Sequence, residues 1–144
     1  MKIFKEEDQS PLFNIRIPLA KFKSTSKKTG KISEQICTQN NSSRWKRWGE
    51  AEIKAEYKQI LTEMFIPEPD DIFTSLTIEF TILRHQKRKL DADNPIVSVK
   101  WFNDTLVSTG WLTDDDQVTI ILKPSEFHTS LVETMYRVRA FQNQ

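Results

Sequence analysis

Two acidic clusters in the sequence have a residue spacing that suits a metal ion. The first is Asp91-Ala92-Asp93-Asn94. Side chains alternate in an extended chain, so Asp91 and Asp93 would point to the same face. Two carboxylates on one face repel each other unless a cation lies between them, and Mg²⁺ is the hard cation that oxygen ligands prefer. Bound Mg²⁺ would polarise a phosphate and generate hydroxide from water, whereas the structural alternative is the ordinary polar start of a helix.

The second cluster is Asp114-Asp115-Asp116, directly before a predicted strand. A helix of about 14 residues, or about 20 Å, separates the two clusters. About six extended residues can return over a similar distance, so we expect Asp115 to approach Asp91 and Asp93. Two alternatives stay open: the cluster is a plain polar turn, or each site is completed by two subunits rather than one.

Other catalytic or metal-binding arrangements find little support. A calcium-binding EF-hand loop that begins at Asp91 needs Gly at its sixth position and Glu at its twelfth, which here are Ile96 and Phe102. The soft or imidazole ligands lack a zinc-like spacing; they are Cys37, His85 and His128. A Ser-His-Asp triad has no local support either.

The motif extends beyond the two acidic clusters. It comprises Asp91-x-Asp93-Asn94, then Lys100, Asp104 and Leu106, then Asp114-Asp115-x-Gln117-Val118. Over roughly residues 84–121 the sequence resembles RusA-like Holliday-junction resolvases, in which an Asp-x-Asp-Asn group precedes a lysine-bearing helix and an Asp-Asp pair begins the next strand. The resemblance implies a homodimer that binds four-way DNA junctions and makes paired, symmetric cuts with Mg²⁺, for which Mn²⁺ would substitute.

The resemblance also implies the roles of individual residues. Asp91, Asp93 and Asp115 would be metal-binding catalytic acids, and Lys100 the active-site lysine. In the family the lysine usually follows the second aspartate by four residues, which here is Val97. Lys100 corresponds to it only if residues 95–97 are an insertion, after which the spacing to Asp115 needs no gap.

Lys100 also has a purely structural interpretation. It can form an exposed i,i+4 ion pair with Asp104 on the predicted helix, which would stabilise that helix by roughly 0.3–0.5 kcal/mol.

The net charge of +1 conceals an uneven distribution of cations. Between residues 21 and 47 the acid Glu34 accompanies eight cations, and a second basic cluster precedes Asp91. Such asymmetry favours a polyanionic partner such as DNA, and the alternative is a solvated surface. The proposed DNA-binding residues are Lys21, Lys23, Lys27, Lys28, Lys31, Arg44, Lys46 and Arg47 in the first cluster, and Arg84, Lys87, Arg88 and Lys89 in the second.

The four tryptophans have two possible roles. Trp45 and Trp48 lie within the basic segment, where they either stack on unpaired bases or pack in the core. Trp101 and Trp111 flank the second predicted helix and suit the core or a dimer interface.

Hydrophobic periodicity predicts the elements that must position these residues. The expected strands are 11–19, 72–84, a buried strand 117–123 and a last strand 130–141, where residues 134–136 could instead be helical. The expected helices are 50–65, stopped by Pro67 and Pro69, and 95–108, capped by Asn94 and stopped by Gly110. Residues 21–43 are polar and are expected to form a long loop or mobile arm. The inward residues would be Ile53, Tyr57, Ile60, Leu61 and Met64 on the first helix, and Ile96, Val99, Phe102 and Leu106 on the second.

This pattern predicts a single α+β domain over residues 1–144, with a mixed sheet of about four strands, two main helices and a basic loop or arm at 21–47. Cys37 is the one cysteine, so no internal disulfide can form. We expect no membrane segment and no organic cofactor, and a cytoplasmic protein of bacterial, phage or prophage origin. Three functions remain to be separated: a metal-dependent junction resolvase, a catalytically silent DNA-binding relative, and an interaction module whose acids are surface features.

Overall fold

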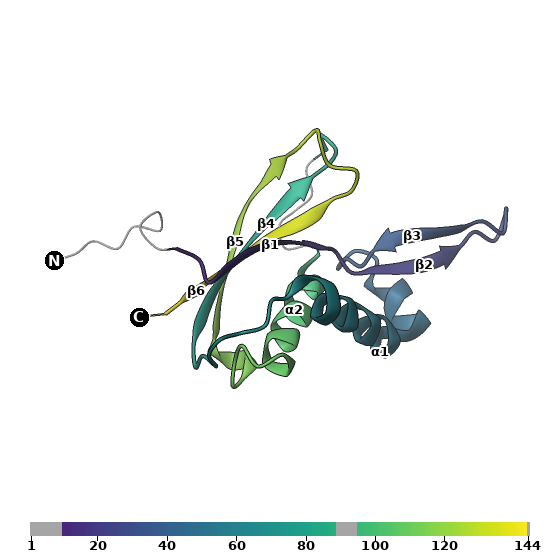
Figure 1. Cartoon of the computed structure of the whole chain (residues 1–144). Coiled ribbons are helices and arrows are strands. Elements are labelled where there is room, and N and C mark those ends of the chain that lie inside the picture. Colours follow the sequence, from purple (N-terminus) through teal and green to yellow (C-terminus); the bar gives the residue numbers. More distant parts are fainter. Residues whose placement is uncertain (1–9, 89–94, 144) are drawn as a thin grey trace.

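The fold is a four-stranded mixed sheet with two helices on one side and a separate β-hairpin. A computed structural model describes residues 10–88 and 95–143. The sheet has the order β1-β6-β4-β5, in which β4 and β5 are parallel and the other neighbours antiparallel. This arrangement confirms the expected α+β class (Figure 1). The described elements are β1 (Phe13–Pro18), β2 (Lys21–Thr25), β3 (Ile32–Ile36), α1 (Ser42–Ile60), the π-helical turn η2 (Leu61–Phe65), β4 (Leu76–Arg84), α2 (Ile96–Ser108), the 3₁₀ turn η3 (Asp115–Gln117), β5 (Val118–Phe127) and β6 (Met135–Gln142).

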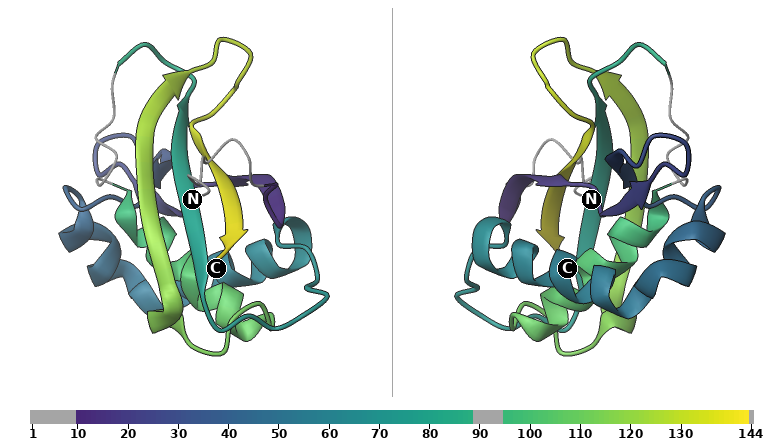
Figure 2. Two further views of the ribbon diagram at one scale, coloured as in Figure 1. Left: turned by 90° about the vertical axis from the view of Figure 1, so that its left-hand side faces the viewer. Right: turned by 90° about the vertical axis from the view of Figure 1, so that its right-hand side faces the viewer.

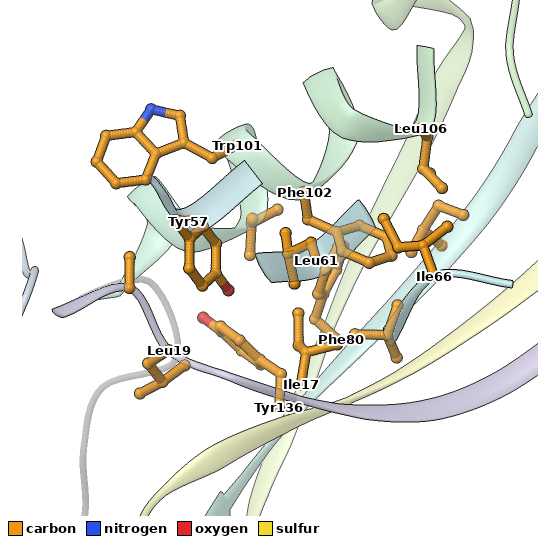
Figure 3. Close-up of a cluster of buried hydrophobic side chains, with 14 of the residues drawn as sticks. Ile17, Leu19, Tyr57, Leu61, Ile66, Phe80, Trp101, Phe102, Leu106 and Tyr136 are labelled. Carbon is orange, nitrogen blue, oxygen red and sulfur yellow. The ribbon is translucent and has the colours of Figure 1, made fainter. Parts of the chain in front are cut away.

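The hydrophobic core lies between the sheet and the two helices, which occupy the same side of it (Figure 2). Phe80 of β4 meets Phe102 of α2 edge to face, with ring centroids 5.6 Å apart. Tyr57 of α1 is buried and donates its hydroxyl hydrogen to the carbonyl of Pro18, at 2.6 Å. Figure 3 shows these rings with Leu61 and Tyr136 in one cluster. None of the helices in the described part of the chain has both the length and the apolar character of a membrane span.

β4, α2 and β5 form one crossover unit, in which the helix connects two parallel strands. α2 begins at Ile96 with Pro95 at its cap position, whereas the sequence predicted Pro95 as the first helical residue; Asn94 lies outside the described residues. The predicted stop at Gly110 is confirmed, because this residue has a φ of 88° and its N–H donates to the carbonyl of Val107. Val99, Phe102 and Leu106 are buried as predicted, and Ile96 is half-buried.

For the last strands, one prediction is wrong, and the strand predicted near the end is confirmed over Met135–Gln142. β5 is an edge strand rather than a buried one, and Ile120 and Ile121 remain 42% and 37% exposed. Its apolar run resembles a central strand, but β4 is its one neighbour in the described sheet. β6 is already a strand at Met135, so the helical alternative for residues 134–136 fails; pairing with both β1 and β4 favours the extended form.

The predicted loop or mobile arm at 21–43 is also wrong, because these residues form a hairpin and the start of α1. β2 pairs with β3 in antiparallel register, from Lys21 opposite Ile36 to Thr25 opposite Ile32. Phe22 is buried, and Gly30 adopts a φ of 67° in the connecting turn. The hairpin escaped prediction because most of its side chains face solvent, which removes the apolar alternation that indicates a strand.

Helix α1 begins at Ser42, eight residues before the predicted start. Gly49 interrupts it with a φ of 124°, which few other residues adopt, so the helix bends there instead of ending. Tyr57 and Leu61 are buried as predicted, whereas the prediction for Met64 is wrong, since it is 72% exposed. The π-helical geometry of η2 adds a residue to the last turn, and this rotates Met64 away from the core.

Candidate active site and nucleic-acid interface

The two acidic clusters flank α2 in the sequence, and the structure describes only part of them. Asp91 and Asp93 lie outside the described residues. The backbone of Asp115 lies in η3, although its side chain is outside the described part. Asp114 and Asp116 are exposed, and the carboxylate of Asp114 accepts the backbone N–H of Asp116 at 3.4 Å. The second cluster is therefore an accessible acidic turn at the start of β5.

The two ends of α2 lie at opposite ends of the main sheet. Near its start, Ser98 accepts a hydrogen bond from the N–H of Ala20, which lies level with the carboxyl end of β4. Beyond its end, Leu112 forms a β-bridge with Phe73, which precedes β4. η3 leads directly into β5, whose first residues pair with the first residues of β4. A helix of this length spans about 20 Å, which separates Pro95 from Ser108. η3 then lies beside α2 again, and Ile120 of β5 lines the same hollow as Lys100.

Lys100 is exposed on the face of α2 that looks toward α1 and β5. Asp104, its suggested i+4 partner, instead forms an ion pair with Lys54 of α1, with Nζ and Oδ2 2.9 Å apart. A shallow hollow of about 370 Å³ lies beside Lys100, and buried Asn103 lines it. The side-chain oxygen of Asn103 has no hydrogen-bond partner among the described residues. Asp104 therefore does not form the i,i+4 ion pair with Lys100 that the structural interpretation of this lysine predicted.

The first basic cluster extends over the hairpin and the first two turns of α1, where it projects from the body of the protein (Figure 1). Lys21 pairs with Glu133, and Arg44 donates to the side-chain oxygen of Gln35 at 3.2 Å, so these two cations have partners within the chain. The remaining side chains of the cluster are exposed; they are Lys23, Lys27, Lys28, Lys31, Lys46 and Arg47. The hairpin thus presents a surface that is rich in positive charge.

The second basic cluster is less accessible than the sequence suggests. Arg84 is only 9% exposed, and its guanidinium donates to the carbonyl of Lys87 at 2.7 Å. It also lies over the ring of Phe127, so it organises the loop after β4. The side chains of Lys87 and Arg88 are exposed, and Lys89 lies outside the described residues.

Three of the four tryptophans belong to the core. Trp45 is buried and donates its indole N–H to the carbonyl of Thr38 at 2.9 Å, so it is not a stacking platform for bases. Trp101 and Trp111 are also buried, while the side chain of Trp48 lies outside the described part.

The described residues offer no alternative metal centre. No group of three His, Cys, Asp or Glu among them lies close enough to hold an ion. Cys37 is buried, and burial raises the pKa of its thiol to about 12, so it remains protonated near neutral pH and is a poor metal ligand.

One charged group escaped the sequence analysis, on the face of the sheet that points away from the helices. Arg16 of β1, Arg137 and Arg139 of β6 and Lys123 of β5 share this face with the buried carboxylate of Glu79. The signal was present in the alternation of β6, where Tyr136, Val138 and Ala140 point into the core and the two arginines point outward.

Comparison with known proteins does not indicate a function for this chain. No protein-family model matches the sequence, and no curated protein matches it. The case for a function therefore rests on the motif around α2 and on the charged surfaces that the fold presents.

Proposed function

We propose that this protein is a magnesium-dependent endonuclease that resolves four-way DNA junctions as a homodimer. The observation that carries the proposal is that the described part of the motif lies on one structural unit, β4–α2–β5, with Lys100 exposed on the helix and Asp115 in the turn η3 that leads into β5. Carboxylate oxygens are the ligands that Mg²⁺ prefers, so the donor set of Asp91, Asp93 and Asp115 suits this ion. Mn²⁺ should substitute for it.

The proposed chemistry divides between the acids and the lysine. When bound, Mg²⁺ supplies Lewis-acid activation of the scissile phosphate and of the attacking water. Asp91, Asp93 and Asp115 would hold the ion and orient the phosphate beside it. Lys100 would donate to a phosphate oxygen, where its positive charge stabilises the negative charge that develops in the transition state.

The acids of the motif lie on both sides of α2 in the sequence, so such a site can be assembled in two ways. Asp115 follows the end of α2, whereas Asp93 precedes its start in the sequence. The three acids would come either from one chain or from two subunits. In either case, a dimer with two-fold symmetry would hold two equivalent sites, which suits two symmetric cuts.

The proposed mechanism predicts a dimer in solution. Light scattering should give about twice the 16.9 kDa mass of the chain, and a strict monomer on junction DNA would contradict the mechanism.

The exposed hairpin predicts how DNA is captured. Replacing Lys27, Lys28 and Lys31 with Ala should weaken binding to junctions of any sequence, because each lysine contributes charge and no base-specific contact. The slope of log K against log salt should become shallower by about 0.9 for each phosphate contact that is lost. Electrophoretic mobility shift at several salt concentrations measures both quantities, with Lys58→Ala on α1 as the control. An unchanged slope would show that the hairpin does not touch phosphate.

The accessible ammonium of Lys100 predicts a kinetic effect without a stability effect. Lys100→Met should slow cleavage by at least about tenfold, a barrier increase of about 1.4 kcal/mol. The melting temperature should stay within experimental error, since Asp104 keeps its ion pair with Lys54. Lys54→Met is the matched control, because it removes that pair and should lower stability more than the cleavage rate. Parental cleavage by Lys100→Met would show that the lysine is not part of the site.

Two other functions predict different results. A catalytically silent relative would bind junctions without cutting them, and a plain interaction module would show no salt-dependent DNA binding. Incubating the protein with a synthetic four-way junction and Mg²⁺ separates the first from the resolvase, and the binding titration separates the second.

A further inference from the structure

The sheet face that points away from α1 and α2 carries a continuous row of basic and hydroxyl side chains. Arg16 lies opposite Arg137, Arg137 lies opposite Thr81, and Thr81 lies opposite Lys123. The row thus crosses all four strands of the main sheet, from β1 through β6 and β4 to β5. Neighbouring strands are about 4.8 Å apart, so the row is about 14 Å long.

This row contains an arrangement that is unfavourable in isolation. Arg16 and Arg137 are direct cross-strand neighbours on the same face, and like charges placed directly opposite destabilise a sheet. Arg139 adds a further positive charge two residues along β6. An anion lying over the row would attract both guanidinium groups and offset the repulsion between them.

The nearby acids only partly offset these cations. Glu79 is 3% exposed, and its carboxylate lies 3.5 Å from Arg139 and 3.6 Å from Lys123. Glu126 accepts two hydrogen bonds from Arg137, and its pKa is lowered by its hydrogen bond to His128 and by Arg137. Among the described residues of this face, four cations thus accompany two acids, and Arg16 has no ion pair with another described residue.

The surface has the form that an extended phosphate backbone requires. A shallow hollow of about 440 Å³ lies over β6, β4 and β5 and does not reach Arg16. Its polar lining consists of Thr81, Ser125, Lys123, Arg137, Arg139 and the two acids. A row of about 14 Å is long enough to face more than one phosphate of a DNA strand that lies along it. Arginine and hydroxyl side chains are usual phosphate ligands, and none of these contacts would read a base sequence.

We propose that this open sheet face is a second DNA-binding surface, which holds the phosphate backbone of a duplex arm apart from the hairpin. The inference rests on the proposed function only in taking DNA as the ligand. The hairpin projects on the helix side of the molecule, whereas this face is turned away from it (Figure 1). The two surfaces can therefore engage different arms of a branched DNA.

The test is the double variant Arg16→Gln, Arg137→Gln, measured for binding to a four-way junction in EDTA over a range of salt. We expect weaker binding and a salt slope shallower by about 1.8, because about two phosphate contacts are lost. The variant Arg16→Lys, Arg137→Lys should retain the slope, since it keeps both charges. Thermal melting without DNA checks folding. If the loss of the contact between Arg137 and Glu126 lowers the melting temperature, DNA binding is measured with Arg16→Gln alone and compared with Lys58→Gln.

The outcomes distinguish this inference from the proposed function. If the parental protein binds the junction and the hairpin variant is weakened, while the sheet-face variants keep parental affinity and slope, the second surface is refuted and the junction-binding function stands. If the parental protein does not bind DNA at any salt concentration, both are wrong. A shallower slope in the sheet-face variants with an unchanged melting temperature would support the second surface directly.

Discussion

Asp93→Asn should abolish cleavage of a four-way junction while leaving junction binding intact. The substitution keeps the size of the side chain but removes the negative charge of a metal ligand, so the divalent ion is held weakly and the phosphate is not activated. Binding should be equal or tighter, because one negative charge near the DNA backbone is lost. Asp91→Asn and Asp115→Asn should behave in the same way, with residual rates at least about a thousandfold below the parental rate, a barrier increase of about 4 kcal/mol.

The matched control for this loss is Asp116→Asn, next to Asp115 in the exposed turn that begins β5. It removes the same charge from the same turn, so a general effect of local charge would appear there too. Full activity in Asp93→Asn, measured under single-turnover conditions with saturating Mg²⁺, would refute the assignment of the metal site.

Mixed dimers of two inactive variants should recover activity only if each site is shared between two subunits. With Asp93→Asn and Asp115→Asn subunits combined at equal concentration, half of the dimers are mixed. If each site takes Asp93 from one subunit and Asp115 from the other, every mixed dimer holds one intact site and one site that lacks both acids. The mixture then contains about a quarter of the parental number of intact sites, and it should nick single strands of the junction rather than make paired cuts.

The control for the mixing experiment is the pair Asp91→Asn and Asp93→Asn. These residues lie two positions apart, on the same side of α2 in the sequence, so their mixed dimers should stay inactive. If the Asp93→Asn and Asp115→Asn mixture is as inactive as its components after subunit exchange has been verified, each site is formed within one chain.

The buried framework was predictable because its side chains repeat with the period of the element. Leu76, Ile78 and Phe80 mark β4, and Val99, Phe102 and Leu106 mark the inner face of α2. Gly110 marked the end of α2 because the turn there needs a positive φ. The hairpin lacked such a signal, because Phe22 is the one buried residue in its two strands.

The parts that escaped prediction depend on contacts between residues far apart in the sequence. The apolar run of β5 resembled a central strand, but its position at the edge follows from the strand order. The ion pair between Lys54 and Asp104 joins two helices, and a single helix offers Asp104 only its own neighbours, such as Lys100. Similarly, Arg16 and Arg137 become neighbours only through the pairing of the first and last strands.

The most direct test of the central claim is cleavage of a synthetic four-way junction, labelled on each strand in turn, with Mg²⁺ and with EDTA. We predict paired cuts near the crossover in two opposed strands with Mg²⁺, no product in EDTA, and no cutting of a linear duplex of the same sequence. Tight junction binding without product at any concentration of Mg²⁺ or Mn²⁺ would contradict the assignment as a nuclease and leave a DNA-binding protein.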